Sequence, residues 1–237
     1  MIALVLLTAC LVAAAFFRRG RGRLVFLAGG AFSALAALAV GINSDWSIGL
    51  DTFVADWFDA RRTPRHDAEA TGVFSYLGRP FHVLAAALVC GVPLSLRRRS
   101  ALPVALIFGA VAVGVVVEQA LKATIGRTAT SGVLAQYPHS YPSGHVTGAA
   151  ALLGSIAVCF AAGRSPAIRK ASAMLVAGAV LAVAGLALYT GAHTCTDVIG
   201  GMLLGGAIVA ACGAVYRAAN PRYPVSEPAV RPAETVA

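Results

Sequence analysis

The chain has 237 residues, of which 58% are hydrophobic and only 12% are charged. Soluble globular proteins carry about 25% charged residues and disordered chains are poor in apolar ones, so this composition excludes both classes. The formal net charge of +9 does not indicate a nucleic-acid partner, because the basic residues form short clusters between long apolar blocks. The composition therefore predicts an integral membrane protein that contacts membrane lipids and no nucleic acid.

Seven apolar blocks are each about long enough to cross a hydrocarbon core of ~30 Å as a helix. They run near Ile2–Phe17, Leu24–Ile42, Pro80–Leu96, Leu102–Ala120, Val146–Ala162, Ala171–Tyr189 and Val198–Tyr216. We therefore predict an all-α fold, a polytopic membrane helix bundle of about seven spans. The first block is short, and a signal peptide is the alternative, but its basic residues follow it instead of preceding it.

The stretch between the second and third blocks, residues 43–79, combines acidic with aromatic side chains. Trp46, Phe53 and Trp57 suit the apolar face of a short amphipathic helix that lies in the membrane interface. An ordinary loop with aromatic side chains at the headgroups explains the same composition equally well. Both interpretations remain open at this point.

Basic residues are distributed unequally between the two sides that seven spans define. Thirteen of the 19 Lys and Arg residues fall on one side. The six on the other side are Arg61, Arg62, Arg65, Arg79, Lys122 and Arg127. The positive-inside rule makes the richer side cytoplasmic. We expect a multi-pass protein of the cell membrane with an external N-terminus.

Polar residues gather at three places near the ends of spans, and all three fall on the predicted external side. They are the segments 118–127, 141–145 and 193–197. Ionisable residues at such positions are costly and indicate function by default. Each segment also has a simpler interpretation: a Glu118–Lys122 ion pair, a surface His145, and a local pair between His193 and Asp197. None of the three is specific alone.

Together the three segments resemble the type 2 phosphatidic acid phosphatase superfamily, whose members include membrane lipid phosphatases. The central motif of that family, Pro-Ser-Gly-His, is complete at residues 142–145. The His-x-x-x-Asp half of its third motif is present as His193 and Asp197, and Lys122 begins its first. The resemblance covers roughly residues 45–216. It implies a six-helix phosphatase core at residues 24–216. The N-terminal span with its basic loop at 1–23 and the tail at 217–237 lie outside the resemblance, and the proline-rich composition of the tail predicts a disordered cytoplasmic segment.

Two arginines of the family pattern are absent. Seven residues after Lys122 stands Ala129, and six before His193 stands Ala187. Arg127 is our candidate for the first missing cation and Arg79 for the second. The alternative for Arg79 is that it only anchors its helix at the headgroups.

The residue types present suit phosphate-ester hydrolysis without a metal or other cofactor. A histidine nitrogen can attack phosphorus when a carboxylate holds its other nitrogen, which fits His193 with Asp197. His145 is then the general acid. The phosphate-binding candidates are Lys122, Arg127, Ser143 and Gly144, with Arg79 as the further possibility.

The sequence thus predicts a membrane-embedded phosphatase that removes phosphate from a lipid phosphate or pyrophosphate on the extracytoplasmic face through a phosphohistidine. The substrate is expected to be a lipid because the site lies at the membrane surface. The alternative is a catalytically weak or inactive relative that binds or transports a phospholipid, which the missing arginines motivate.

Overall fold

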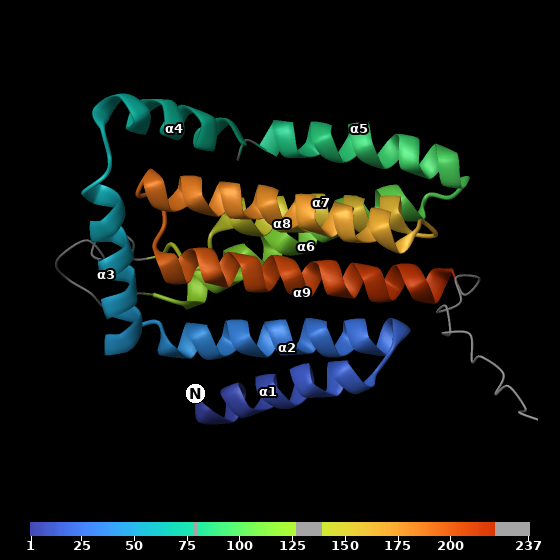
Figure 1. Cartoon of the computed structure of the whole chain (residues 1–237), viewed down its shortest axis with the longest axis horizontal. Helices are drawn as coiled ribbons and strands as arrows, with labels where there is room; N and C mark the ends of the chain where they lie inside the picture. Colours follow the sequence, from blue (N-terminus) through green and yellow to red (C-terminus); the bar gives the residue numbers. More distant parts are fainter. Residues whose placement is uncertain (78–79, 127–138, 221–237) are drawn as a thin grey trace, which may run out of the picture.

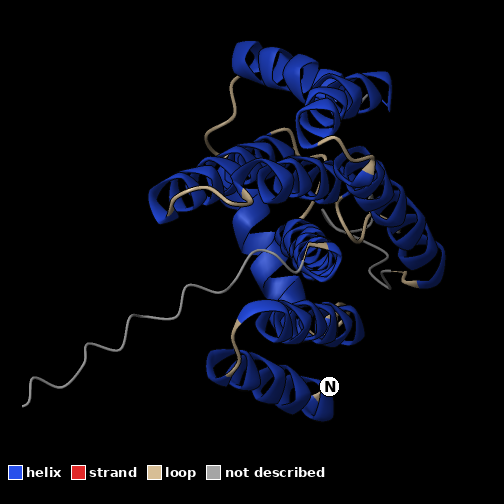
Figure 2. Ribbon diagram, turned by 90° about the vertical axis from the view of Figure 1, so that its right-hand side faces the viewer, coloured by secondary structure: helices blue, strands red, loops and turns tan. Residues whose placement is uncertain are grey.

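The structure is a computed structural model that describes residues 1–77, 80–126 and 139–220. These residues are helical and contain no strand (Figures 1 and 2). The helices are α1 (Ile2–Phe17), α2 (Gly20–Gly41), α3 (Asp45–Asp59), α4 (Pro64–Leu77), α5 (Pro80–Arg98), α6 (Leu102–Thr124), α7 (Gly144–Ala161), α8 (Pro166–Tyr189) and α9 (Cys195–Ala219). The predicted all-α fold is confirmed.

Six of these helices are long and apolar enough to cross a membrane, namely α2 and α5 to α9. The seventh apolar helix, α1, has only 16 residues and packs along α2 at the edge of the bundle (Figure 1). The long helices lie side by side, and the figure places the N-terminus at the end of the bundle where α9 begins. The protein is a multi-pass membrane protein, and the prediction of about seven spans agrees with this arrangement.

The segment between the second and third apolar blocks, residues 43–79, contains helices. Its first part is the helix α3, which runs across one end of the bundle (Figure 1). This helix exposes Trp46, Phe53 and Trp57, while Ser47 and Asp51 are fully buried. Of the two interpretations of this segment, the amphipathic helix is therefore the one observed.

A second helix in this segment, α4, was not predicted. It is polar and gives no apolar block, yet Thr63 precedes it and Pro64 opens it, which is a standard helix start. The His66 N–H donates to the Thr63 hydroxyl over 3.4 Å. α4 continues alongside α8 toward α5 (Figure 1).

The centre of the bundle is a close contact between α7 and α9 that depends on small residues. A Cβ on Gly201 of α9 would lie 2.7 Å from the Ser143 carbonyl oxygen. One turn later, a Cβ on Gly205 would collide with Ala150 of α7. Small residues let membrane helices approach closely, and here they bring the N-terminal ends of α7 and α9 together.

Candidate active site

The three polar segments meet at the end of the bundle that α3 crosses. The Ser143 N–H, at the start of α7, donates to the Asp197 carbonyl oxygen of α9 over 2.9 Å. Glu118 of α6, which binds Lys122, lies against Gly144 at the same start of α7. The structure therefore brings together side chains that are 75 positions apart in the chain.

His193 and Asp197 form a pair at the start of α9. The distance from His193 Nδ1 to Asp197 Oδ2 is 3.6 Å, and the side chains are 11% and 0% exposed. His193 precedes the helix, because Thr194 is the N-cap and Asp197 is the third helical residue of a capping box. Asp197 Oδ2 also accepts the Thr194 N–H over 3.0 Å. Helix capping, not two neighbouring turns of helix, fixes the carboxylate in front of the imidazole.

The start of α7 has the features of an anion site. Ser143 is its N-cap and is fully buried, but its hydroxyl makes no capping bond. The Ser143 Oγ has no hydrogen-bond partner within the described residues. Buried hydroxyls are usually paired, and a helix N-terminus offers unpaired N–H groups and a positive dipole end. An oxyanion at this position would satisfy all of these donors.

His145 is the second residue of α7 and makes an aromatic contact. Its ring stacks on that of Phe74 from α4, with centroids 3.9 Å apart and planes inclined by 24°. Phe74 is buried and belongs to an apolar cluster that includes Val146 and Ala187. The apolar cluster around Phe74 therefore includes the residue at the position of the missing family arginine.

Lys122 is the cation that the structure places at this end of α6. Its ammonium lies 2.5 Å from Glu118 Oε1, so the ion pair expected from the sequence is present. The Glu118 carboxylate in turn lies against Gly144, where a Cβ would be 2.7 Å from Glu118 Cδ. The other two cation candidates, Arg127 and Arg79, lie outside the described residues.

Three residues near the site carried no recognised signal in the sequence: Asp51, Arg62 and Phe74. In the sequence, Asp51 was only one acidic residue of the segment between two spans, and Arg62 was only one of its basic residues. Each acts on a partner more than 70 residues away in the chain. Only the start of α4, at Thr63 and Pro64, had a recognisable sequence pattern.

No group of three or more His, Cys, Asp or Glu side chains within the described residues could hold a metal ion. The five cysteines in this part of the chain are all unpaired. The donors that the described site offers to a ligand are therefore two imidazoles, one ammonium, one hydroxyl and backbone N–H groups.

Comparisons with known proteins identify the fold and the family. The PAP2 superfamily matches residues 101–221, which include all three polar segments from Glu118 to Asp197. Among solved structures, the chain is similar to the first transmembrane PAP2 type phosphatidylglycerolphosphate phosphatase from Bacillus subtilis, with a TM-score of 0.64 and 19% identity. That match covers 85% of this chain and 100% of the other. No curated protein gives a significant match. Because this family match spans half of its length, the chain belongs to the PAP2 superfamily.

Proposed function

We propose that the protein is a membrane-embedded phosphatase that hydrolyses a lipid phosphate or pyrophosphate through a phosphohistidine. The observation that carries the proposal is the His193–Asp197 pair, whose carboxylate is fully buried, beside a helix start whose buried hydroxyl has no partner among the described residues. A nucleophile oriented by a carboxylate and a helix start able to bind an oxyanion are two elements that phosphoryl transfer uses. The PAP2 family membership supports the same activity.

The first step in this mechanism forms a bond from His193 Nε2 to phosphorus while the bond from phosphorus to the ester oxygen breaks. Asp197 holds the Nδ1 proton and stabilises the positive charge that develops on the ring. The 3.6 Å separation is longer than a hydrogen bond, and such contacts tighten when the substrate is bound. His145 gives its proton to the departing alkoxide oxygen.

The second step returns the enzyme to its starting state. His145, now neutral, takes a proton from water, and the resulting oxygen attacks phosphorus and releases His193. During both steps Lys122, the Ser143 hydroxyl and the N–H groups at the start of α7 neutralise charge on the phosphoryl oxygens. The stack on Phe74 restricts the ring of His145.

A lipid phosphate is the substrate class that the position of the site favours. The site lies where apolar helices end, so a phosphate could reach His193 while its acyl or prenyl chains stay among the bundle and the surrounding lipid. The similar Bacillus subtilis protein is a phosphatidylglycerolphosphate phosphatase, which agrees with this class.

The experiment that tests the function measures phosphate release by the purified protein in detergent, with a chelator present. Phosphatidic acid, phosphatidylglycerophosphate and a polyprenyl pyrophosphate form the panel. We expect release from at least one lipid, an acid-labile labelled phosphate trapped on wild type, and neither signal from His193→Ala. Activity that a chelator abolishes and a divalent metal restores would show that this mechanism is wrong.

One observation favours a second candidate, a phospholipid-binding protein without turnover. Ala187 is fully buried in the apolar cluster around Phe74, so this position supplies no charge to a phosphate. The same panel separates the candidates. Saturable binding of a lipid phosphate, with no phosphate released by wild type, would support the binding protein and exclude the phosphatase.

A further inference from the structure

The connection between α8 and α9, which carries His193, is held at both of its ends by the segment that contains α3. At the α9 end, Asp51 accepts hydrogen bonds from the Thr196 N–H and from the Thr196 hydroxyl, each 2.7 Å long. At the α8 end, Arg62 Nε donates to the Tyr189 carbonyl oxygen over 2.8 Å. Two charged side chains thus bind the backbone on either side of His193.

Of the two side chains, Asp51 carries the greater cost of burying a charge, because it is fully buried. A buried carboxylate is costly unless hydrogen bonds and positive charge compensate it, and here it meets the N-terminal turn of a helix. Thr196 directly precedes Asp197, so Asp51 fixes the turn that presents the Asp197 carboxylate to His193. The geometry of the catalytic pair therefore depends on α3.

Arg62 binds the other end of the connection from the turn after α3. Its guanidinium also pairs with Asp59 at 2.9 Å and lies 3.7 Å from Asp67. Gly191 has φ +64°, and a Cβ there would lie 3.0 Å from Arg62 Nη2. The guanidinium is therefore packed against the backbone two residues before His193, with its charge already compensated by carboxylates.

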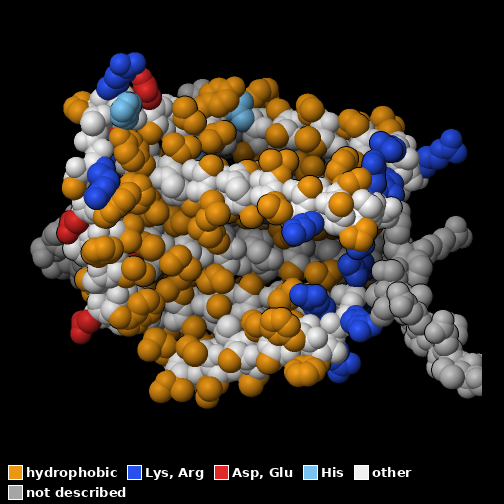
Figure 3. Space-filling model, in the orientation of Figure 1, with side chains coloured by type: hydrophobic (Ala, Val, Ile, Leu, Met, Phe, Trp, Pro, Cys, Tyr) orange, Lys and Arg blue, Asp and Glu red, His pale blue; other side chains and the backbone are white. Residues whose placement is uncertain are grey.

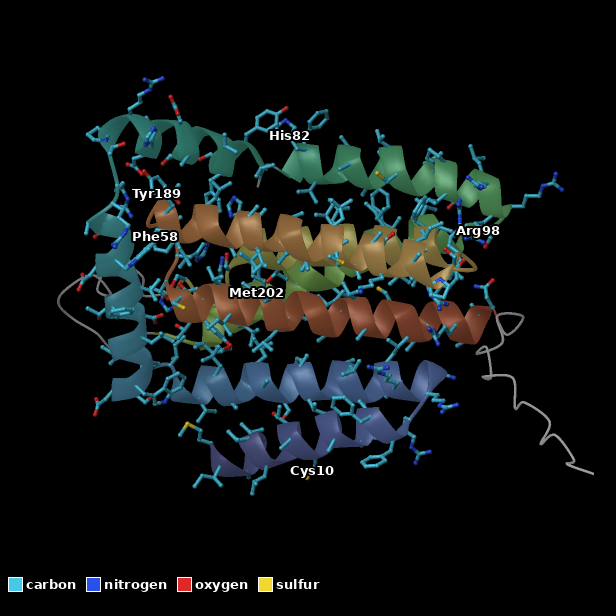
Figure 4. All side chains as sticks on the ribbon, in the orientation of Figure 1. Cys10, Phe58, His82, Arg98, Tyr189 and Met202 are labelled. Carbon is cyan, nitrogen blue, oxygen red and sulfur yellow. The ribbon has the colours of Figure 1, made fainter. Side chains whose placement is uncertain are left out.

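Apolar contacts join the same two segments. Figure 4 shows Phe58 of α3 and Tyr189 of α8 at the same end of the bundle, and their rings meet edge to face with centroids 6.3 Å apart. A small pocket lies between the segments, and its lining includes Phe58, Arg62 and His193. The α3 segment and the histidine connection form one packed unit.

We infer that Asp51 and Arg62 are positioning residues that hold the connection so that His193 Nδ1 faces Asp197. The inference rests on the proposed function, in which His193 is the nucleophile. Neither residue touches the transferred phosphate. These residues affect how often the imidazole has the orientation needed for attack. Replacing them should therefore change the rate of the chemical step and leave lipid binding unchanged.

The kinetic test compares Asp51→Ala and Arg62→Ala with two matched controls on the same segment. The controls are Asp56→Ala and Arg61→Ala, which remove the same charges from exposed positions; Arg61 bonds only its own helix at Trp57 in the described contacts. We expect kcat for lipid-phosphate hydrolysis to fall at least tenfold in the two positioning variants, with KM within twofold of wild type. Both controls should retain wild-type kcat.

Conservative variants distinguish positioning from a general loss of folding. Asp51→Asn keeps an oxygen that can accept the Thr196 N–H, so it should recover most of the kcat lost in Asp51→Ala. Thr196→Val removes only the hydroxyl bond and should lower kcat less, about threefold. If Asp51→Ala fails to fold, Thr196→Val decides, and an unchanged kcat in that variant counts against the inference.

Hydrogen–deuterium exchange gives a readout that does not need turnover. Amides of residues 190–196 should exchange faster in Asp51→Ala and Arg62→Ala than in Asp56→Ala and Arg61→Ala. If the wild type is active, and both kcat and exchange are unchanged in the positioning variants, this inference is overturned while the proposed function stands. A wild type that releases no phosphate would instead fail the proposed function, and the positioning role with it.

Discussion

At the start of α9, one carboxylate oxygen takes part in two interactions. Asp197 Oδ2 accepts the Thr194 N–H over 3.0 Å and lies 3.6 Å from His193 Nδ1. The capping bond holds the oxygen in place whatever the charge on the imidazole. A residue that caps the start of a helix is thereby also placed beside the His193 ring, where the proposed mechanism needs a carboxylate.

Asp197→Asn separates these two interactions. The asparagine side chain can still accept the Thr194 N–H, so the helix start and the thermal unfolding temperature should change little. Turnover should fall by roughly 10³-fold or more, because a neutral amide neither fixes the reactive tautomer of His193 nor stabilises its cation. Phosphate release and thermal unfolding of the purified variant measure both effects. A variant that keeps a tenth of wild-type turnover would contradict the role of the carboxylate.

Ser143→Ala tests whether the hydroxyl without a partner serves the substrate. Removing a buried, unpaired hydroxyl should not lower the unfolding temperature, because no bond within the described residues is lost. Turnover should fall about 10²-fold, the low end of the cost of losing one such donor to the phosphoryl oxygens.

The matched control for Ser143→Ala is Ser155→Ala on the same helix. Ser155 is equally buried, but its hydroxyl donates to the Leu152 carbonyl oxygen over 3.0 Å, far from the site. This control should keep its turnover. A lower unfolding temperature in Ser143→Ala than in Ser155→Ala would show that the Ser143 hydroxyl is structural.

At the scale of helices, the site depends on how closely three helix ends approach. α6 brings Glu118 against Gly144 of α7, and α9 brings Gly201 against the Ser143 carbonyl oxygen. α3 crosses the same end and binds the first turn of α9 through Asp51. Each contact joins a different pair of helices, so the position of the catalytic groups is a property of the packing.

Gly144→Ala tests the contact between α6 and α7. Its Cβ would lie 2.7 Å from Glu118 Cδ, so the carboxylate and the Lys122 that it binds must move. We expect turnover to fall at least tenfold, measured as phosphate release. Gly148→Ala, one turn later, meets nothing within 4 Å and should instead stabilise the helix by up to about 1 kcal/mol. Equal turnover in the two variants would contradict the role of this contact.

At the scale of the whole molecule, charge differs between the two ends of the bundle. Figure 3 shows Lys and Arg side chains gathered at the end opposite α3 and acidic side chains at the α3 end. Arg98 belongs to the basic end, where its guanidinium donates to the Ala162 carbonyl oxygen over 2.5 Å. By the positive-inside rule, this asymmetry supports a cytoplasmic basic end and a site that faces away from the cytoplasm.

Cysteine labelling in intact cells tests this orientation. In a cysteine-free background, Thr63→Cys lies between α3 and α4, and Ser100→Cys lies between α5 and α6; both positions are exposed. A membrane-impermeant reagent should label position 63 at once and position 100 only after the cells are opened. Labelling of position 100 but not of position 63 in intact cells would show that the orientation is the opposite one.

The sequence by itself determined the membrane class and the helical fold, and it supplied most of the candidate site residues. Blocks of about 20 apolar residues match the thickness of the hydrocarbon core, and a helix pairs its own backbone groups in lipid, so such blocks predict helical spans. The Pro142–His145 motif and the His193–Asp197 spacing are short local patterns, so they are legible without a fold. The span boundaries were less accurate: α2 begins at Gly20, before the expected Leu24, because the sequence boundary marks the first apolar residue while the helix also includes the Gly-Arg-Gly-Arg that precedes it.

Only the tertiary structure decided which distant residues support that site. Asp51 meets Thr196 across 145 positions, and Phe74 stacks on His145 from a helix with no apolar block. No periodicity records such pairs, because a partner on another helix is set by how helix ends cross and not by spacing along the chain. For the same reason the sequence proposed His193 as the nucleophile, while only the packing of α3 across the bundle revealed which residues contact the connection that carries it.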